Sequence, residues 1–211
     1  MNEQMEMDSH LEFVFMQLLH EVNLVTLKWL TAHELFGVSE ERVELLNRTA
    51  GGFFSVIQVS LRDDTFISLS RLTDPIQSAG KDNLTLLTLS EHLAQFRDRQ
   101  FLESLQKQIT DSIAKCEGIR IWRNKRLAHS DLNVLLKYDP SPLPGISVKQ
   151  VDDAIRSIQD VINTFSQYFF GTINYFGTII QTGGPDRLFH HLKIALDAQE
   201  REIEKKINLH G

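Results

Sequence analysis

An arginine, an asparagine and a histidine follow one another closely in the segment 123–129. This segment reads Arg-Asn-Lys-Arg-Leu-Ala-His, with Arg123 and Asn124 at its start and His129 at its end. A guanidinium can hold a phosphate group through two parallel hydrogen bonds, and an imidazole can move a proton near neutral pH. Together, these residue types favour phosphate binding combined with proton transfer.

Arg123 also occupies a position where the helical pattern predicts an apolar side chain. An apolar stripe repeats upstream at steps of three and four residues, and it consists of Leu102, Leu105, Ile109, Ile113 and Cys116. At the same spacing the stripe continues to Arg120, Arg123 and Leu127. Because a guanidinium is rarely buried without a partner, Arg123 is expected to have one.

The segment around Arg123 is basic, although the chain as a whole is acidic. Residues 115–126 contain five lysines and arginines and one glutamate, whereas the net charge of the chain is −6. Basic residues in the last turns of a helix commonly complement the helix dipole, and this accounts for Lys125 and Arg126 better than for Arg123. The acidic total argues against a generally basic, DNA-binding surface, so a nucleic-acid role would need a local basic site.

The spacing of Arg123 and His129 limits how the two side chains can meet. On an unbroken α-helix, residues six positions apart point ~120° away from each other. They would share a site if the helix were distorted near its end, or if two copies of the chain faced each other across a dimer axis. A lone histidine at a helix end is otherwise typical of a capping or dipole interaction.

The run Arg-Asn-Lys-Arg-Leu-Ala-His-Ser-Asp over residues 123–131 resembles the signature of the HEPN superfamily. In that signature a polar residue follows an arginine, and a histidine comes a few residues later. More narrowly, the chain resembles the AbiU-type branch of abortive-infection proteins. The runs Ser-Arg-Leu-Thr-Asp-Pro at 70–75 and Asn-Leu-Thr-Leu at 83–86 agree with that branch. The resemblance extends over residues 10–180.

The resemblance implies an all-helical bundle that forms a homodimer, in which two Arg–His motifs share one cleft. In active members this cleft cleaves RNA without a metal ion. Arg123 would then stabilise the scissile phosphate, Asn124 would orient groups in the cleft, and His129 would be the general acid or base. The RNA 2′-hydroxyl lies beside the phosphorus, so a base and a cationic clamp suffice. Other members bind without cleaving, and fold and motif do not settle activity.

Further polar residues are expected to support the cleft or bind the ligand, namely Asp64, Arg71, Arg120, Arg126 and Asp131. Asp64, Ser68 and Arg71 share one face of a helix. This pattern is more typical of a charge network that positions helices than of direct catalysis. Asp131 could orient His129, although capping the helix end is the simpler interpretation.

Neither a metal site nor a cofactor is expected. His190 and His191 are adjacent, so they point ~100° apart on a helix, and no ligand follows at metal-binding spacing. The glycine pairs 51–52 and 183–184 lack the pattern of a phosphate loop. Cys116 is the single cysteine, which excludes an internal disulfide, and its place on the apolar stripe predicts a core residue.

Helical periodicity predicts an all-α, up-and-down bundle of five to six helices. Long helices are expected over residues 12–30, 53–72, 101–128, 147–176 and 187–206. Two shorter helices are expected, one capped by Ser39 and one from Ser90 to about Arg97. Asp74-Pro75 should end one helix and Ser147 should cap another. Residues 76–84 are predicted to form a loop, and no strand is expected.

The whole chain, 1–211, is expected to form a single HEPN-like helical domain, with residues 185–211 as a C-terminal helical extension. Residues 161–185 carry no charged side chain, but polar residues interrupt them and their apolar residues form a stripe, so we predict a core helix and no membrane span. The acidic start after Met1 indicates no signal peptide, and the single cysteine suits a reducing cytoplasm.

Two functions from different classes follow. The first is a HEPN-type endoribonuclease in bacterial defence, or the toxin of a toxin–antitoxin pair, with RNA and an antitoxin protein as partners. The second is a non-catalytic dimeric helical module that binds RNA or a partner protein. The intact Arg–Asn–His set and the basic segment favour the enzyme. The acidic total charge favours the binding module.

Overall fold

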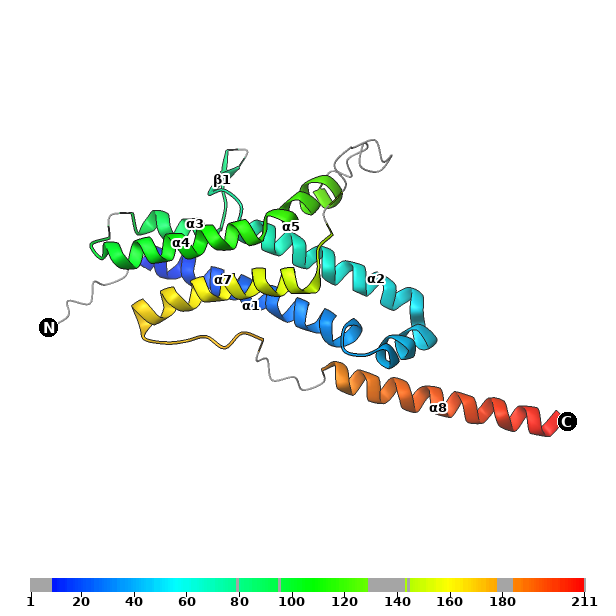
Figure 1. Cartoon of the computed structure of the whole chain (residues 1–211). Helices are drawn as coiled ribbons and strands as arrows, with labels where there is room; N and C mark the ends of the chain where they lie inside the picture. The colour runs from blue at the N-terminus through cyan, green and yellow to red at the C-terminus, as the bar shows by residue number, and fades with distance from the viewer. Residues whose placement is uncertain are drawn as a thin grey trace. The chain divides into compact units, whose positions relative to one another are not determined.

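The chain is all-α, and the computed structural model describes residues 9–78, 80–94, 96–128, 143, 145–177 and 184–210. The long helices are α1 (Ser9–Phe36), α2 (Glu40–Leu72), α4 (Arg99–Lys115), α7 (Val148–Phe170) and α8 (Pro185–His210) (Figure 1). The short elements are α3 (Leu86–His92), α5 (Glu117–Trp122), the π-helix η1 (Arg123–Ala128) and the strands β1 (Gln77–Ser78) and β2 (Lys81–Asp82). The predicted all-α helical bundle is confirmed.

The chain divides into two compact units. Unit 1 contains Met1–Thr26 and Asp63–Gly177, and unit 2 contains Leu27–Arg62 and Thr178–Gly211. Helices α1 and α2 each contribute one part to unit 1 and the other part to unit 2. The basic segment that carries Arg123 belongs to unit 1. The expected single domain with a C-terminal extension stays a prediction.

Unit 1 is held together by apolar side chains from several helices. Its fully buried centre consists of Leu18, Val22, Leu69, Leu105, Ile109, Ile158, Ile162 and Phe165. Helix α4 packs along α7 (Figure 1). The rings of Phe101 and Tyr168 stack between these two helices, with their centroids 3.8 Å apart. Phe15 of α1 stacks on Phe165 of α7 at 4.7 Å. The predicted stripe of α4 therefore faces the core.

Local capping residues decide where α4 and α7 begin and end. The Asp98 carboxylate accepts a hydrogen bond from the Phe101 N–H at 2.9 Å, and Ser147 caps α7 as predicted by accepting from the Gln150 N–H at 3.2 Å. Helix α7 ends at Phe170 rather than near residue 176. Gly171 adopts a left-handed conformation with φ of 65°, which ends the helix.

The segment between α2 and α4 differs from the prediction in two ways. The expected loop 76–84 contains a small antiparallel hairpin, β1–β2, because Gly80 with φ of 74° allows a tight turn. Helix α3 begins at Leu86 and ends at His92, whereas Ser90 was predicted to start it and Arg97 to end it. The buried apolar residues Leu86 and Leu89 fix the earlier start.

Two further boundaries depend on backbone features that periodicity does not reveal. The break that the helices expected around Ser39 and over 53–72 imply is present, because Ala50, with φ of −157° and ψ of 59°, is not helical and divides α2 into two helical parts at a kink directly before the glycine pair 51–52. The predicted helix 101–128 is divided, because Cys116 forms a turn between α4 and α5 and a π-helix follows. Asp74-Pro75 ends α2 as predicted.

Unit 2 has its own apolar core, to which α8 contributes. Its buried residues are Leu35, Leu46, Phe54 and Phe189. Arg42 forms an ion pair with Asp186 at 2.6 Å and lies over the ring of Phe189 at 4.8 Å. Arg48 pairs with Glu200 farther along α8. The predicted C-terminal helix is thus an integral part of this unit.

Among the described helices, none has the length and apolar character needed to cross a membrane. The uncharged stretch that begins at Val161 contributes Val161, Ile162 and Phe165 to the core of unit 1. Its polar residues Ser166 and Thr172 bond to each other at 2.9 Å. This agrees with the prediction of a core helix.

Candidate functional site

The segment that carries the arginines leaves α-helical geometry at Arg123. Helix α5 ends at Trp122, and residues Arg123–Ala128 form the π-helix η1. A π-helix has i→i+5 hydrogen bonds and occurs mostly as a single turn, frequently at functional sites. The helix is therefore distorted from α-helical geometry from Arg123 onward. His129 itself lies outside the described residues.

Arg123 has its partner within the chain, and that partner is Asp74. The Arg123 Nη2 donates to the Asp74 Oδ1 at 2.5 Å. The Arg123 side chain is 24% exposed and that of Asp74 is 16% exposed, so the pair is largely shielded but reachable from solvent. The expected partner of Arg123 is thereby identified, and an arginine on the apolar stripe is explained without a second copy of the chain.

Arg120 binds the same end of α2. Its Nη1 donates to the Thr73 carbonyl oxygen at 3.2 Å, and its Nη2 lies 3.6 Å from the Asp74 Oδ1. The predicted helical spacing therefore brings Arg120 and Arg123 together. Two guanidiniums share one carboxylate, which leaves an excess positive charge at the site.

Asp74 is held in place by the end of α2. The Asp74 N–H donates to the Arg71 carbonyl oxygen at 3.3 Å, and the hydroxyl of the buried Thr73 donates to the Leu69 carbonyl oxygen at 2.9 Å. Pro75 follows and prevents the helix from continuing. The backbone of Asp74 is thus fixed by the end of α2, and its carboxylate contacts the two arginines.

Apolar contacts dock α5 on α2 beside the ion pairs. The rings of Phe66 and Trp122 meet edge to face with their centroids 6.3 Å apart. Cys116 is fully buried as predicted, and its thiol hydrogen-bonds the Thr73 side chain. Burial raises the pKa of Cys116 to about 11, outweighing the Thr73 hydrogen bond and the nearby charge of Arg120. This thiol is therefore a core group and not a nucleophile.

Arg123 keeps hydrogen-bonding capacity for a ligand. Its Nε is buried and has no hydrogen-bond partner among the described residues, although Nη2 is bound to Asp74. A guanidinium has five N–H donors, and an oxygen acceptor could occupy the remaining ones. The Nε is itself buried, so an oxyanion would bind the exposed 24% of the side chain.

The other predicted residues fall into three groups. Asn124 and Arg126 follow Arg123 in η1 and are exposed. Asp64 is half-buried and Arg71 is exposed, while Ser68 between them is buried, so their shared face is not uniformly accessible. The predictions for His129 and Asp131 fall outside the described residues.

The sequence did not single out Asp74 as a site residue. Its separation of 49 positions from Arg123 hides the contact from any local pattern. One signal was available, since Asp74 belongs to the Ser-Arg-Leu-Thr-Asp-Pro run that carries part of the family resemblance. Asp74 is an acidic residue at the end of a predicted helix, and Arg123 was an arginine that still needed a partner. Asp74 could therefore have been proposed as the partner of Arg123.

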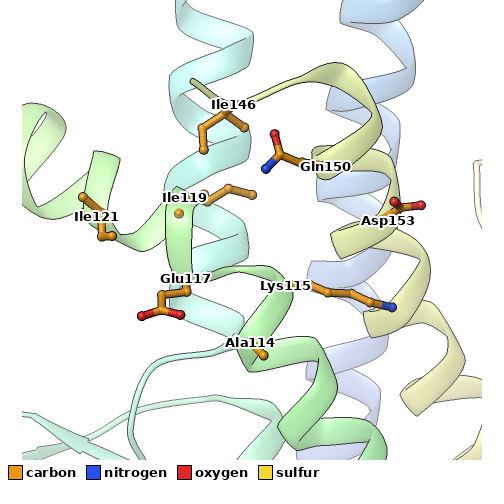
Figure 2. Close-up of a pocket in the computed structure, with 9 residues that line it drawn as sticks. Ala114, Lys115, Glu117, Ile119, Ile121, Ile146, Gln150 and Asp153 are labelled. Atoms are coloured by element: carbon orange, nitrogen blue, oxygen red, sulfur yellow. The ribbon is translucent and has the colours of Figure 1, made fainter. Parts of the chain in front are cut away.

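A pocket of about 420 Å³ is lined by residues of α4, α5 and α7 together with Ile146. Figure 2 shows Ile119 of α5 near Ile146 and Lys115 of α4 extending towards Asp153 of α7. Neither Arg120 nor Arg123 lines it. Asp153 is already paired with Lys149 at 2.6 Å. This pocket is therefore separate from the arginine site, and no chemistry follows from its lining.

The described residues contain no cluster of three or more histidine, cysteine, aspartate or glutamate side chains that could hold a metal ion. The site chemistry within that part of the chain consists of two guanidiniums, one carboxylate and the polar residues of η1. Such a set can bind an oxyanion.

An all-α bundle with an arginine-led signature at the end of a helix is the pattern of HEPN domains. The HEPN model described as AbiU2 matches residues 9–182, and the chain belongs to this family. The family membership predicted from the sequence is confirmed. Helix α8 lies outside the matched residues. No curated protein and no solved structure gives a significant match.

Proposed function

We propose that this AbiU2-family protein is a metal-independent endoribonuclease, acting in bacterial defence or as the toxin of a toxin–antitoxin pair. One observation carries the proposal: the Arg123 guanidinium is held by Asp74 and shares that carboxylate with Arg120, while 24% of the Arg123 side chain stays exposed. A fixed and partly exposed guanidinium is suited to a phosphodiester oxygen. The basic segment 115–126 supplies local attraction for RNA.

In this mechanism the RNA supplies its own nucleophile. The 2′-oxygen forms a bond to phosphorus as the bond from phosphorus to the 5′-oxygen breaks. A base takes the proton of the 2′-hydroxyl, and an acid returns a proton to the leaving 5′-oxygen. His129 is the acid or base, Arg123 stabilises charge on the phosphorane-like transition state, and Asn124 orients groups in the cleft. The products are a 2′,3′-cyclic phosphate and a 5′-hydroxyl end.

The active form is proposed to be a homodimer in which two Arg–His motifs share one cleft. Exposed apolar residues on unit 1 support an association surface, among them Ile121 on α5, two residues before Arg123. Ile121→Glu should therefore convert the dimer to a monomer and reduce cleavage. Light scattering at micromolar concentration would measure the mass, and a wild-type monomer would contradict the proposal.

The test of the proposed function compares wild type with His129→Ala. Removal of a well-placed general acid or base lowers the rate by ~10²–10⁴. We expect the purified variant to keep its helical circular dichroism and its RNA binding while losing cleavage. The RNA ends of the wild-type reaction should be a cyclic phosphate and a hydroxyl. Cleavage by an intact His129→Ala protein would refute the role of His129.

The absence of metal dependence is tested by chelation. We expect cleavage to continue in EDTA, since the proposed mechanism uses only a guanidinium, a proton carrier and the RNA hydroxyl. Loss of activity that a defined divalent ion restores would overturn the metal-free mechanism. RNA binding without any cleavage by wild type would instead favour the binding module, with Arg123 as a phosphate contact.

A further inference from the structure

One oxygen of Asp74 lies between two guanidiniums. The Asp74 Oδ1 is 2.5 Å from the Arg123 Nη2 and 3.6 Å from the Arg120 Nη2. The exposed fractions of the three side chains are 16% for Asp74, 24% for Arg123 and 28% for Arg120. In such a partly shielded place, charges interact more strongly than on an open surface.

The two arginines depend on Asp74 to different degrees. Arg120 has a second anchor, because its Nη1 donates to the Thr73 carbonyl oxygen at 3.2 Å. Among the described residues, the hydrogen bond of the Arg123 side chain goes to Asp74. The position of Arg123 is therefore the one that the carboxylate controls, whereas Arg120 stays attached to the end of α2.

We propose that Asp74 is a positioning residue for the reaction proposed above, and that it lowers RNA affinity while it raises the rate of cleavage. This inference rests on the proposed function. The carboxylate fixes the Arg123 guanidinium in one orientation and keeps the two arginines from repelling each other. The same negative charge offsets part of the attraction that the site exerts on phosphate groups.

The two effects of the carboxylate should separate when its charge is removed. Without it, Arg123 loses its fixed orientation, and a misplacement of about 1 Å can lower a rate by ~10². The site also gains one net positive charge, and affinity for nucleic acid depends on the number of such charges and on salt. Equal or tighter RNA binding together with slower cleavage is a combination that simple unfolding cannot produce.

The experiment compares full-length Asp74→Asn, Asp74→Glu and wild type. For Asp74→Asn we expect kcat to fall ~10–100-fold. Its affinity for a short fluorescent single-stranded RNA should be unchanged or higher, with a salt dependence steeper by about 0.7 in log–log slope. Asp74→Glu keeps the charge, and it should restore the wild-type salt slope and part of the rate.

A matched control removes one carboxylate elsewhere. Asp197 is exposed on α8 in unit 2, so Asp197→Asn changes the net charge by the same amount. We expect it to match wild type in kcat, affinity and salt slope. If Asp74→Asn behaves like this control, or if it loses binding and cleavage in proportion to its helical content, Asp74 has no positioning role.

A readout without RNA separates this inference from the proposed function. In a ¹⁵N-labelled sample, an ordered Arg123 should give a distinct side-chain Nε–H signal, which Arg123→Lys would identify by its loss. We expect Asp74→Asn to merge this signal with those of mobile arginines, and Asp197→Asn to keep it. Wild-type protein that does not cleave RNA would refute the proposed function alone. A signal that persists in Asp74→Asn would refute the positioning role alone.

Discussion

At the scale of single residues, the ion pair of Arg123 and Asp74 determines what the site can do. A half-buried guanidinium with one fixed contact is ordered, and its remaining donors are directed by that contact. Removing one member of such a pair leaves the other charge uncompensated. The free-energy cost of that uncompensated charge exceeds the net stabilisation that the intact pair provides. Arg123 is thus stabilised by its neighbour and partly exposed to solvent at the same time.

The geometry of the guanidinium, and not only its charge, should matter for cleavage. Arg123→Lys keeps the charge but removes the planar set of donors, and we expect the rate to fall by ~10²-fold or more. Circular dichroism should stay unchanged. Arg187→Lys, at an exposed position on α8, is the control and should cleave like wild type. A fully active Arg123→Lys protein would show that a point charge suffices.

The thiol of Cys116 should be unreactive in the folded protein. Burial raises its pKa to about 11, so the folded protein holds the thiol protonated at pH 8, and the chain has no other cysteine. Iodoacetamide should therefore label the chain in denaturant, where the pKa is ~8.5, but not the native protein. Mass spectrometry measures the labelling, and rapid native labelling would contradict the burial of Cys116.

The same pKa change predicts how stability depends on pH. The folded pKa lies above the unfolded value, so the stabilisation from the protonated thiol is complete below pH ~8.5 and is lost as the pH rises towards about 11. The free energy of unfolding should fall over that window. Cys116→Ala should lack this part of the decline, which urea titrations at several pH values would measure.

The sequence predicted the arginines of the site but not the residue that holds them. Periodicity placed Arg120 and Arg123 on the buried side of one helix, and both are half-buried there. Asp74 was predicted only to end α2, since a contact across 49 positions depends on how α2 and α5 pack. The roles of Asn124 and His129 stay predictions.

At the scale of helices and turns, hydrophobic periodicity predicted the helices that have a long apolar face. It did not predict the helix ends that depend on the backbone conformation of a single residue. The apolar stripe of α4 and the Ser147 cap of α7 were predicted from residue types alone. The predicted end of α7 was wrong, because apolar residues continue at helical spacing beyond Gly171. The spacing of apolar residues does not reveal that Gly171 adopts the left-handed conformation that ends the helix.

The left-handed end of α7 gives a prediction for stability. Gly171→Ala places a side chain at φ of 65°, which should lower the free energy of unfolding by ~1 kcal/mol. Gly52 lies inside α2 with open space around it, so Gly52→Ala should instead stabilise the protein by ~0.5–1 kcal/mol. Urea denaturation would measure both changes. The opposite signs distinguish a strained backbone from a general effect of alanine.

At the scale of the whole molecule, α8 belongs to unit 2 while the arginine site belongs to unit 1. Phe189 is buried in the unit 2 core, so Phe189→Ala should destabilise that unit by ~3 kcal/mol. Hydrogen exchange in α8 should increase, and RNA cleavage by the remaining folded protein should stay near wild type. The exposed Ile203 provides a control, since Ile203→Ala should change stability by less than ~0.5 kcal/mol.

The contact between Arg123 and Asp74 also has a consequence for the order of folding. It closes a loop that contains the hairpin, α3 and α4, and loop closure costs conformational entropy that grows with the logarithm of length. The adjacent helices α3 and α4 can associate locally before this loop closes. A partly folded chain therefore carries its arginines without their carboxylate. Under the proposed function, a nascent protein would cleave RNA only once α5 has docked on the end of α2.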